Sequence, residues 1–170
     1  MSIKVETALS AEEQVLLARL KSFRVPGMAR ALESQLKDPN ADLNTFMERI
    51  SQLIDAEWQA RADKRFDRLM KEAHLRYPAA DLDETIYRPE RRLDTQTIER
   101  LSTCHWIDEG KNLIVTGSSE SGKTYLINTI CIAAMLQSRH VRYIKANTLM
   151  SEMEQARIKS TNLDYLNRLT

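Results

Sequence analysis

Residues 117–124 constrain this 170-residue chain more than any other stretch, because they match the phosphate-binding pattern G-x-x-x-x-G-K-[ST] without a mismatch. The pattern is informative only in context, since a buried strand must precede the loop and a helix must follow it. Both are predicted here. A short apolar run at 113–115 comes directly before the loop, and a glycine-free apolar segment begins directly after it.

Each residue type in this loop has a defined part in holding phosphate. Glycine permits backbone angles and a close approach that a Cβ would hinder, so successive N–H groups can point inward as an anion nest. The lysine is placed to reach the β- and γ-phosphates, and the threonine hydroxyl is a ligand for Mg²⁺. The predicted cofactors are therefore a nucleoside triphosphate, which the resemblance described below implies to be ATP, and Mg²⁺, with Thr124 as the metal ligand. The candidate nucleotide-binding residues are Gly117, Ser118, Ser119, Glu120, Ser121, Gly122, Lys123 and Thr124.

Glu120 places a carboxylate beside a site built for phosphate oxygens. If its side chain turns inward, repulsion between like charges weakens nucleotide binding. If it turns to solvent, the effect is small, and this is the arrangement we expect.

The remainder of the chain has the composition and spacing of helices. Four glycines and four prolines are few for an all-β fold. Apolar residues at helical spacing predict two helices within 10–38 and a long one, of about 30 residues, within 41–77, where neither Gly nor Pro occurs. A short helix is expected at 95–104, a second strand at 141–146, and one or two helices after it.

These elements predict a helix-rich α/β chain in three parts. Residues 1–75 form a helical N-terminal domain, 76–110 a connector with a short helix, and 111–170 part of a P-loop ATPase core. The order within that core is strand, P-loop, helix, strand, helix. Two strands without further partners make a poor sheet, so we expect the segment from Asn112 onward to have little stability by itself.

Composition excludes several classes of function. The formal net charge of +1 gives no electrostatic argument for a nucleic-acid partner over the whole chain. Three histidines and two cysteines form no recognisable metal or catalytic cluster. No apolar run approaches the ~18 residues of a membrane span, and the N-terminal segment lacks the apolar centre of a signal peptide. We therefore expect a cytoplasmic protein without a membrane partner.

One local basic group could still contact DNA. The residues of this group lie on the predicted long helix, and most of them share one face. Contacts of basic side chains to phosphates do not depend on the base sequence. The alternative is a solvated, salt-bridged surface, because acids are interleaved and Arg68 can pair with Glu72 at i,i+4. The candidate DNA-binding residues are Arg61, Lys64, Arg65 and Arg68, and a second basic group is Arg88, Arg91 and Arg92.

Three aromatic residues complete the candidates. Trp58 and Trp106 lie within apolar helical spacing, so we expect both to pack rather than to stack on bases. Tyr87 precedes Arg88 and could lie against an adenine, although an exposed connector tyrosine is the simpler interpretation.

Three segments carry a resemblance to a known family. They are LKSFRVPGMARALESQL at 20–36, DAEWQAR at 55–61 and LSTCHWIDEGKNLIVTGSSESGKTYL at 101–126. Together they resemble the IstB-like proteins, ATP-binding helpers of bacterial insertion-sequence transposition that are related to DnaC-type helicase loaders. The resemblance covers nearly the whole chain. It implies an AAA+ ATPase with a helical N-terminal domain, which assembles on DNA as an ATP-bound homo-oligomer and acts with a transposase.

The chain departs from the family pattern in two places. The family commonly has Pro near Ser118 and Gly near Glu120. The resemblance also implies a later apolar strand ending in paired acids, which holds Mg²⁺ and orients the attacking water. No segment matches that strand, so we expect a C-terminally truncated chain that binds ATP or ADP weakly and hydrolyses little.

Two other functions stay open at this point. The helical half could be a non-enzymatic interaction module with a vestigial P-loop. A different P-loop class, such as a small kinase, is disfavoured because no acceptor-site or lid segment follows the loop.

Overall fold

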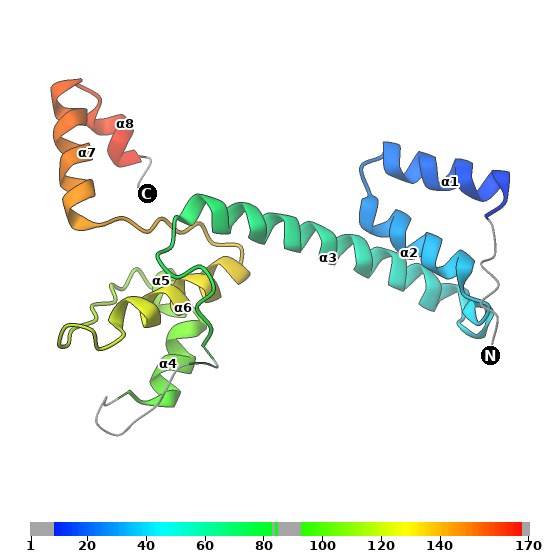
Figure 1. The fold of residues 1–170 in the computed structure, drawn as a ribbon, viewed down its shortest axis with the longest axis horizontal. Helices are drawn as coiled ribbons and strands as arrows, with labels where there is room; N and C mark the ends of the chain where they lie inside the picture. The colour runs from blue at the N-terminus through cyan, green and yellow to red at the C-terminus, as the bar shows by residue number, and fades with distance from the viewer. Residues whose placement is uncertain (1–8, 83, 85–92, 168–170) are drawn as a thin grey trace. The chain divides into compact units, whose positions relative to one another are not determined.

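The structure, a computed structural model, describes residues 9–82, 84 and 93–167, and in these ranges it contains helices and no strand (Figure 1). Compact packing divides the chain into two units, Met1–Arg65 and Phe66–Thr170, so the division falls within the longest helix. The division into 1–75, 76–110 and 111–170 stays a prediction.

The helices are α1 Ala11–Ser22, α2 Pro26–Lys37, the 3₁₀ helix η1 Ala41–Leu43, α3 Phe46–Ala73, α4 Thr95–Ser102, α5 His105–Asp108, α6 Lys123–Leu136, α7 Ala146–Ile158 and α8 Asn162–Asn167.

The predicted α/β class is wrong for the described residues, because neither predicted strand forms. Residues 111–117 are irregular, and Ile114, expected in a buried strand, is 83% exposed. Residues 141–145 are irregular as well, and the N–H of Tyr143 donates to the carbonyl of Ala73 at the end of α3. A strand exists through its hydrogen bonds to a neighbouring strand, and an apolar β-rich sequence does not supply that neighbour. The predicted helices, in contrast, do form.

The first unit places α1 beside α2 and α2 against α3 (Figure 1). Ser10 begins α1 with a capping box, since its hydroxyl accepts the N–H of Glu13 and the Glu13 carboxylate accepts the N–H of Ser10. Pro26 starts α2 at its first position, where its missing N–H costs no hydrogen bond. Gly27 lets α2 approach α3 closely, because a Cβ at this position would lie 2.5 Å from the carbonyl oxygen of Ala56.

Glu57 of α3 connects these two helices and is 7% exposed. One carboxylate oxygen accepts the N–H groups of Gly27 (2.9 Å) and Met28 (3.3 Å), at the end of α2 where the helix dipole favours a negative charge. The other oxygen accepts the Nε of Arg61 at 2.7 Å. The hydrogen bond from Arg61, with those from the two N–H groups, holds the pKa of Glu57 below its ordinary value. Glu57 therefore supplies the cap that α2 lacks within its own sequence.

The second unit has two small hydrophobic cores, and α6 contributes to both. Leu69 and Ala73 at the end of α3 pack with Met135 in the first core, and Ile98 of α4 packs with Leu126 and Ile130 in the second. The helix after the loop is thus buried over much of its girth, as its apolar composition predicts. None of the described helices is both long and apolar enough to cross a bilayer.

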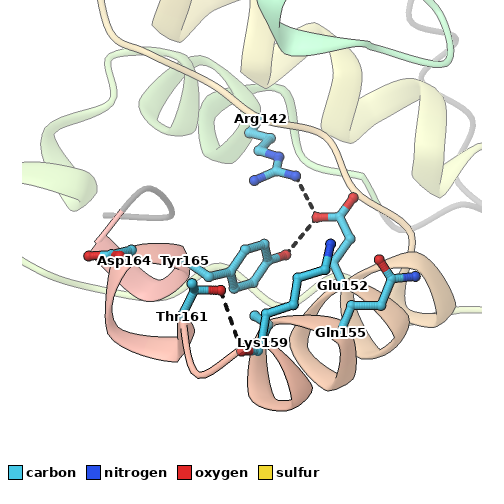
Figure 2. A pocket seen from close by; sticks show the side chains of 8 residues that line it. Arg142, Glu152, Gln155, Lys159, Thr161, Asp164 and Tyr165 are labelled. Carbon is cyan, nitrogen blue, oxygen red and sulfur yellow. Dashed lines mark hydrogen bonds and ion pairs between the residues drawn. The ribbon is translucent and has the colours of Figure 1, made fainter.

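Polar contacts around Glu152 connect α7, α8 and the segment before them (Figure 2). Its Oε2 accepts a hydrogen bond from the Nη2 of Arg142 and another from the hydroxyl of Tyr165, each at 2.7 Å. The hydrogen bond from Tyr165 lowers the pKa of Glu152, and the same carboxylate raises the pKa of the Tyr165 phenol. These groups line a cavity of about 370 Å³, together with Lys159 and Asp164. The cavity is lined by charges of both signs.

Candidate functional site

The loop at 117–122 leads directly into α6, and both of its glycines have backbone angles that favour glycine. Gly122, the N-cap residue of α6, has φ 85° and ψ 11°, and its carbonyl accepts the N–H of Leu126 at 3.0 Å. Gly117 has φ 155°, and a Cβ there would lie 3.3 Å from the Oγ of Ser121. The motif therefore has the backbone freedom that its chemistry needs.

Lys123 folds back over this loop. Its Nζ donates to the carbonyl oxygen of Ser118 and lies 3.4 Å from the Oγ of Ser121, which also accepts from it. Gly122, the N-cap residue of α6, has no side chain that could cap the helix. The N–H groups at the start of α6, the positive end of the helix dipole and an ammonium group thus come together, and each of them favours a bound anion.

Thr124 is the second residue of α6, and its carbonyl oxygen accepts the Nδ2 of Asn128 at 2.7 Å. Within the described ranges, no group of three or more His, Cys, Asp or Glu residues could hold a metal ion. The assignment of the Thr124 hydroxyl as a ligand of Mg²⁺ stays a prediction.

Glu120 is at the tip of the loop in the left-handed conformation, with φ 61°. A residue with a Cβ costs roughly 1–2 kcal/mol in this region, which glycine adopts freely. The residue is exposed, in agreement with the expected orientation, but it still contributes to the lining of the cavity beside the loop. The position thus combines backbone strain with a negative charge beside the candidate phosphate site.

A cavity of about 530 Å³ opens beside the loop and has the size of a typical small-molecule site. Residues 119–125 form one side of it, and Arg76 and Tyr77, which follow α3, complete the lining. Sequence reasoning missed these two residues, because they lie 40 positions or more before the loop and match no motif. Tyr87 and the basic residues Arg88, Arg91 and Arg92 lie outside the described residues.

The four candidate DNA-binding residues of α3 are exposed, but they differ in their contacts. Arg61 is bound to Glu57, as described above, and so has a structural partner. The predicted ion pair of Arg68 with Glu72 is confirmed, at 3.9 Å. Lys64 is exposed on the same helix. Whether these side chains contact DNA stays a prediction.

The two tryptophans differ from each other. Trp106 packs as expected, and its Nε1 donates to the carbonyl of Leu101 at 2.9 Å. The prediction for Trp58 is wrong, because its side chain is 77% exposed. Glu57 occupies the face of α3 that meets α2, and the next residue on a helix points about 100° away. Apolar spacing alone did not distinguish the two faces.

Comparison with known proteins agrees with the geometry of the loop. The family described as IstB-like ATP binding protein matches residues 18–169. A Pseudomonas fluorescens protein named as an ATP-binding protein of insertion sequence IS1162 is 36% identical over 143 residues, which cover 84% of this chain and 62% of that protein. The Sinorhizobium fredii protein y4pL, named as an insertion sequence ATP-binding protein, is 28% identical over 83% of this chain and 57% of its own length. The chain thus spans about six tenths of the curated relatives that it matches. It belongs to the family of IstB-like ATP-binding proteins.

Proposed function

We propose that this chain binds ATP with Mg²⁺ through residues 117–124, and that it acts as the ATP-binding helper of an insertion-sequence transposase on DNA. The observation that carries the proposal is the loop itself. It has two glycines with positive φ, a lysine folded over the loop and the N-terminus of a helix behind it, all beside a cavity of about 530 Å³. The names of the relatives support ATP binding and the context of an insertion sequence.

The residues of the loop would act mainly through charge and orientation. Lys123 exchanges its contact with the Ser118 carbonyl for a phosphate oxygen, which gains a charge-assisted hydrogen bond. The N–H groups at the start of α6 bind the phosphate next to it. The hydroxyl of Thr124 contributes one ligand to Mg²⁺, which neutralises phosphate charge when it is bound.

Titration calorimetry with ATP and Mg²⁺ tests this proposal. We expect the wild-type chain to bind and Lys123→Ala to lose binding. Lys111→Ala is the matched control, since Lys111 is an exposed lysine that pairs with Glu109 and does not line the cavity. If the wild type does not bind ATP, or if Lys123→Ala binds equally well, the interaction module with a vestigial loop becomes the better function.

The DNA part of the proposal is supported by the exposed basic side chains of α3. Such contacts would be independent of base sequence and would weaken steeply with salt. A mobility-shift series at increasing salt, with unrelated duplexes as competitors, tests both properties. Retention that depends on one duplex sequence, or that does not change with salt, would argue against this surface. Co-purification of the chain with the transposase of its element, with and without ATP, tests the remaining partner.

A further inference from the structure

We propose that Arg76 and Tyr77 form the base-binding wall of the nucleotide cavity, and that Asn128 is the positioning residue that holds this wall beside the phosphate loop. The inference rests on the proposed function, because it concerns the same cavity and the same ligand class, a nucleoside triphosphate.

Asn128 connects the two sides of the cavity through a single side chain. It lies on α6 and is completely buried. Its Oδ1 accepts the N–H of Tyr77 at 2.9 Å, while its Nδ2 donates to the carbonyl of Thr124 at 2.7 Å. A buried carboxamide is costly unless its polar atoms are paired, and here the partners come from segments about 50 residues apart in sequence. The position of Tyr77 is thereby fixed to the backbone of the predicted Mg²⁺ ligand.

A second contact fixes the same connector. The hydroxyl of Tyr125, on the first turn of α6, accepts the N–H of Asp81 at 3.0 Å and donates to the Oε2 of Glu84 at 3.0 Å. The rings of Tyr77 and Tyr125 are also neighbours, with centroids 6.0 Å apart and planes inclined by 53°. The connector is thus bound to α6 at two places, so that its first residues lie at the cavity independently of any ligand.

The wall itself presents two flat groups. The guanidinium carbon of Arg76 lies 5.4 Å from the ring centroid of Tyr77, and both residues are exposed where they line the cavity. Aromatic rings and guanidinium planes are the surfaces on which nucleobases stack, with little preference among bases. Since Lys123 and the start of α6 occupy the phosphate side, this wall is the remaining side of the cavity for the base and the ribose.

The experiment compares ATP with inorganic tripolyphosphate, which has the phosphates but no base, by calorimetry in the presence of Mg²⁺. We expect Tyr77→Ala to weaken ATP binding by about tenfold, in the range of base-on-aromatic stacking, and to leave tripolyphosphate binding unchanged. Tyr77→Phe should retain ATP binding, because stacking needs the ring and not the hydroxyl. Tyr165→Phe serves as a control outside this cavity.

Asn128→Ala tests the positioning role. We expect it to weaken ATP binding more than tripolyphosphate binding, and to remove most of the further effect of Tyr77→Ala, because the ring is then no longer held in place. A purely structural role would reduce the two affinities equally and would overturn the assignment. If circular dichroism shows that Asn128→Ala is unfolded, Asn128→Leu, which has a similar volume but no acceptor for the Tyr77 N–H, replaces it.

The outcomes separate this inference from the proposed function. If the wild type binds neither ATP nor tripolyphosphate, the proposed function fails. If it binds both, and Tyr77→Ala leaves the ratio of the two affinities unchanged, the base-binding wall is refuted while the phosphate site stands. If Arg76→Ala weakens both ligands equally, Arg76 contacts phosphate and its assignment to the base is wrong.

Discussion

The close approach of α2 to α3 at Gly27 makes a quantitative prediction for Gly27→Ala. The added Cβ would lie 2.5 Å from the carbonyl oxygen of Ala56 and 2.8 Å from the Cα of Glu57, whereas ordinary contact begins at 3.4 Å. Both neighbours are backbone atoms, which cannot rotate away. The two helices must therefore separate by almost 1 Å, which also lengthens the hydrogen bond from the Gly27 N–H to Glu57.

Two opposing effects determine the size of the change. Overpacking of this kind costs about 1–3 kcal/mol. Replacing glycine by alanine inside a helix gains about 1 kcal/mol. Because the clash involves backbone on both sides, we take the upper part of the first range and expect a net loss of about 2 kcal/mol in the free energy of unfolding.

Urea unfolding followed by circular dichroism measures this loss. With a slope of about 1–3 kcal/mol per molar urea, the midpoint should fall by about 1 M. Ser34→Ala is the matched control, because it introduces the same residue on the exposed side of α2 and should leave the midpoint unchanged or slightly higher. If Gly27→Ala is as stable as the wild type, helix propensity outweighs the clash, and the reasoning from the close contact of α2 with α3 is refuted.

Three further predictions concern charged residues. The folded protein holds the pKa of Glu57 below the ordinary value of 4.5. The stability that the ionised carboxylate contributes is therefore fully present above pH 4.5 and is lost as the pH falls through the lowered pKa. Glu57→Gln should be less stable than the wild type at neutral pH, but should lose less stability in acid. A Gln variant with an acid transition as steep as that of the wild type would contradict this. Glu120→Gly should bind ATP a few-fold more tightly in calorimetry, because it removes a carboxylate from the cavity lining. Glu120→Gln separates the effect of the charge from that of the backbone conformation, and no gain in either variant would refute the reasoning. Lys64→Ala should reduce DNA retention at low salt without a change in thermal stability. Arg61→Ala should lower the stability, because it removes the one cationic partner of the buried Glu57 carboxylate and leaves only the two N–H groups of α2. Equal effects on DNA with unchanged melting would assign both residues to the DNA surface.

Local sequence signals predicted the helices well. Apolar residues at helical spacing and the interval without Gly or Pro at 41–77 are local signals, and the capping box of Ser10 and the position of Pro26, which the structure shows, also depend only on interactions within a few residues. The two strands failed because pairing is not local: the segments at 113–115 and 141–146 have the right composition, but a strand also needs a neighbour, and none is present among the described residues.

The same distinction between local signals and tertiary contacts applies to the candidate site. The sequence by itself determined the candidate phosphate-binding loop, because glycine freedom, a lysine and a helix N-terminus are properties of one continuous segment. The tertiary structure alone decided which residues face that loop and which contacts hold them there. Arg76 and Tyr77 reach the cavity because the buried carboxamide of Asn128 binds the connector to α6, and Arg61 has a structural partner because Glu57 caps a helix 30 residues earlier in the chain. Both depend on burying polar groups with their partners satisfied, a requirement that joins distant segments and leaves no local pattern in the sequence.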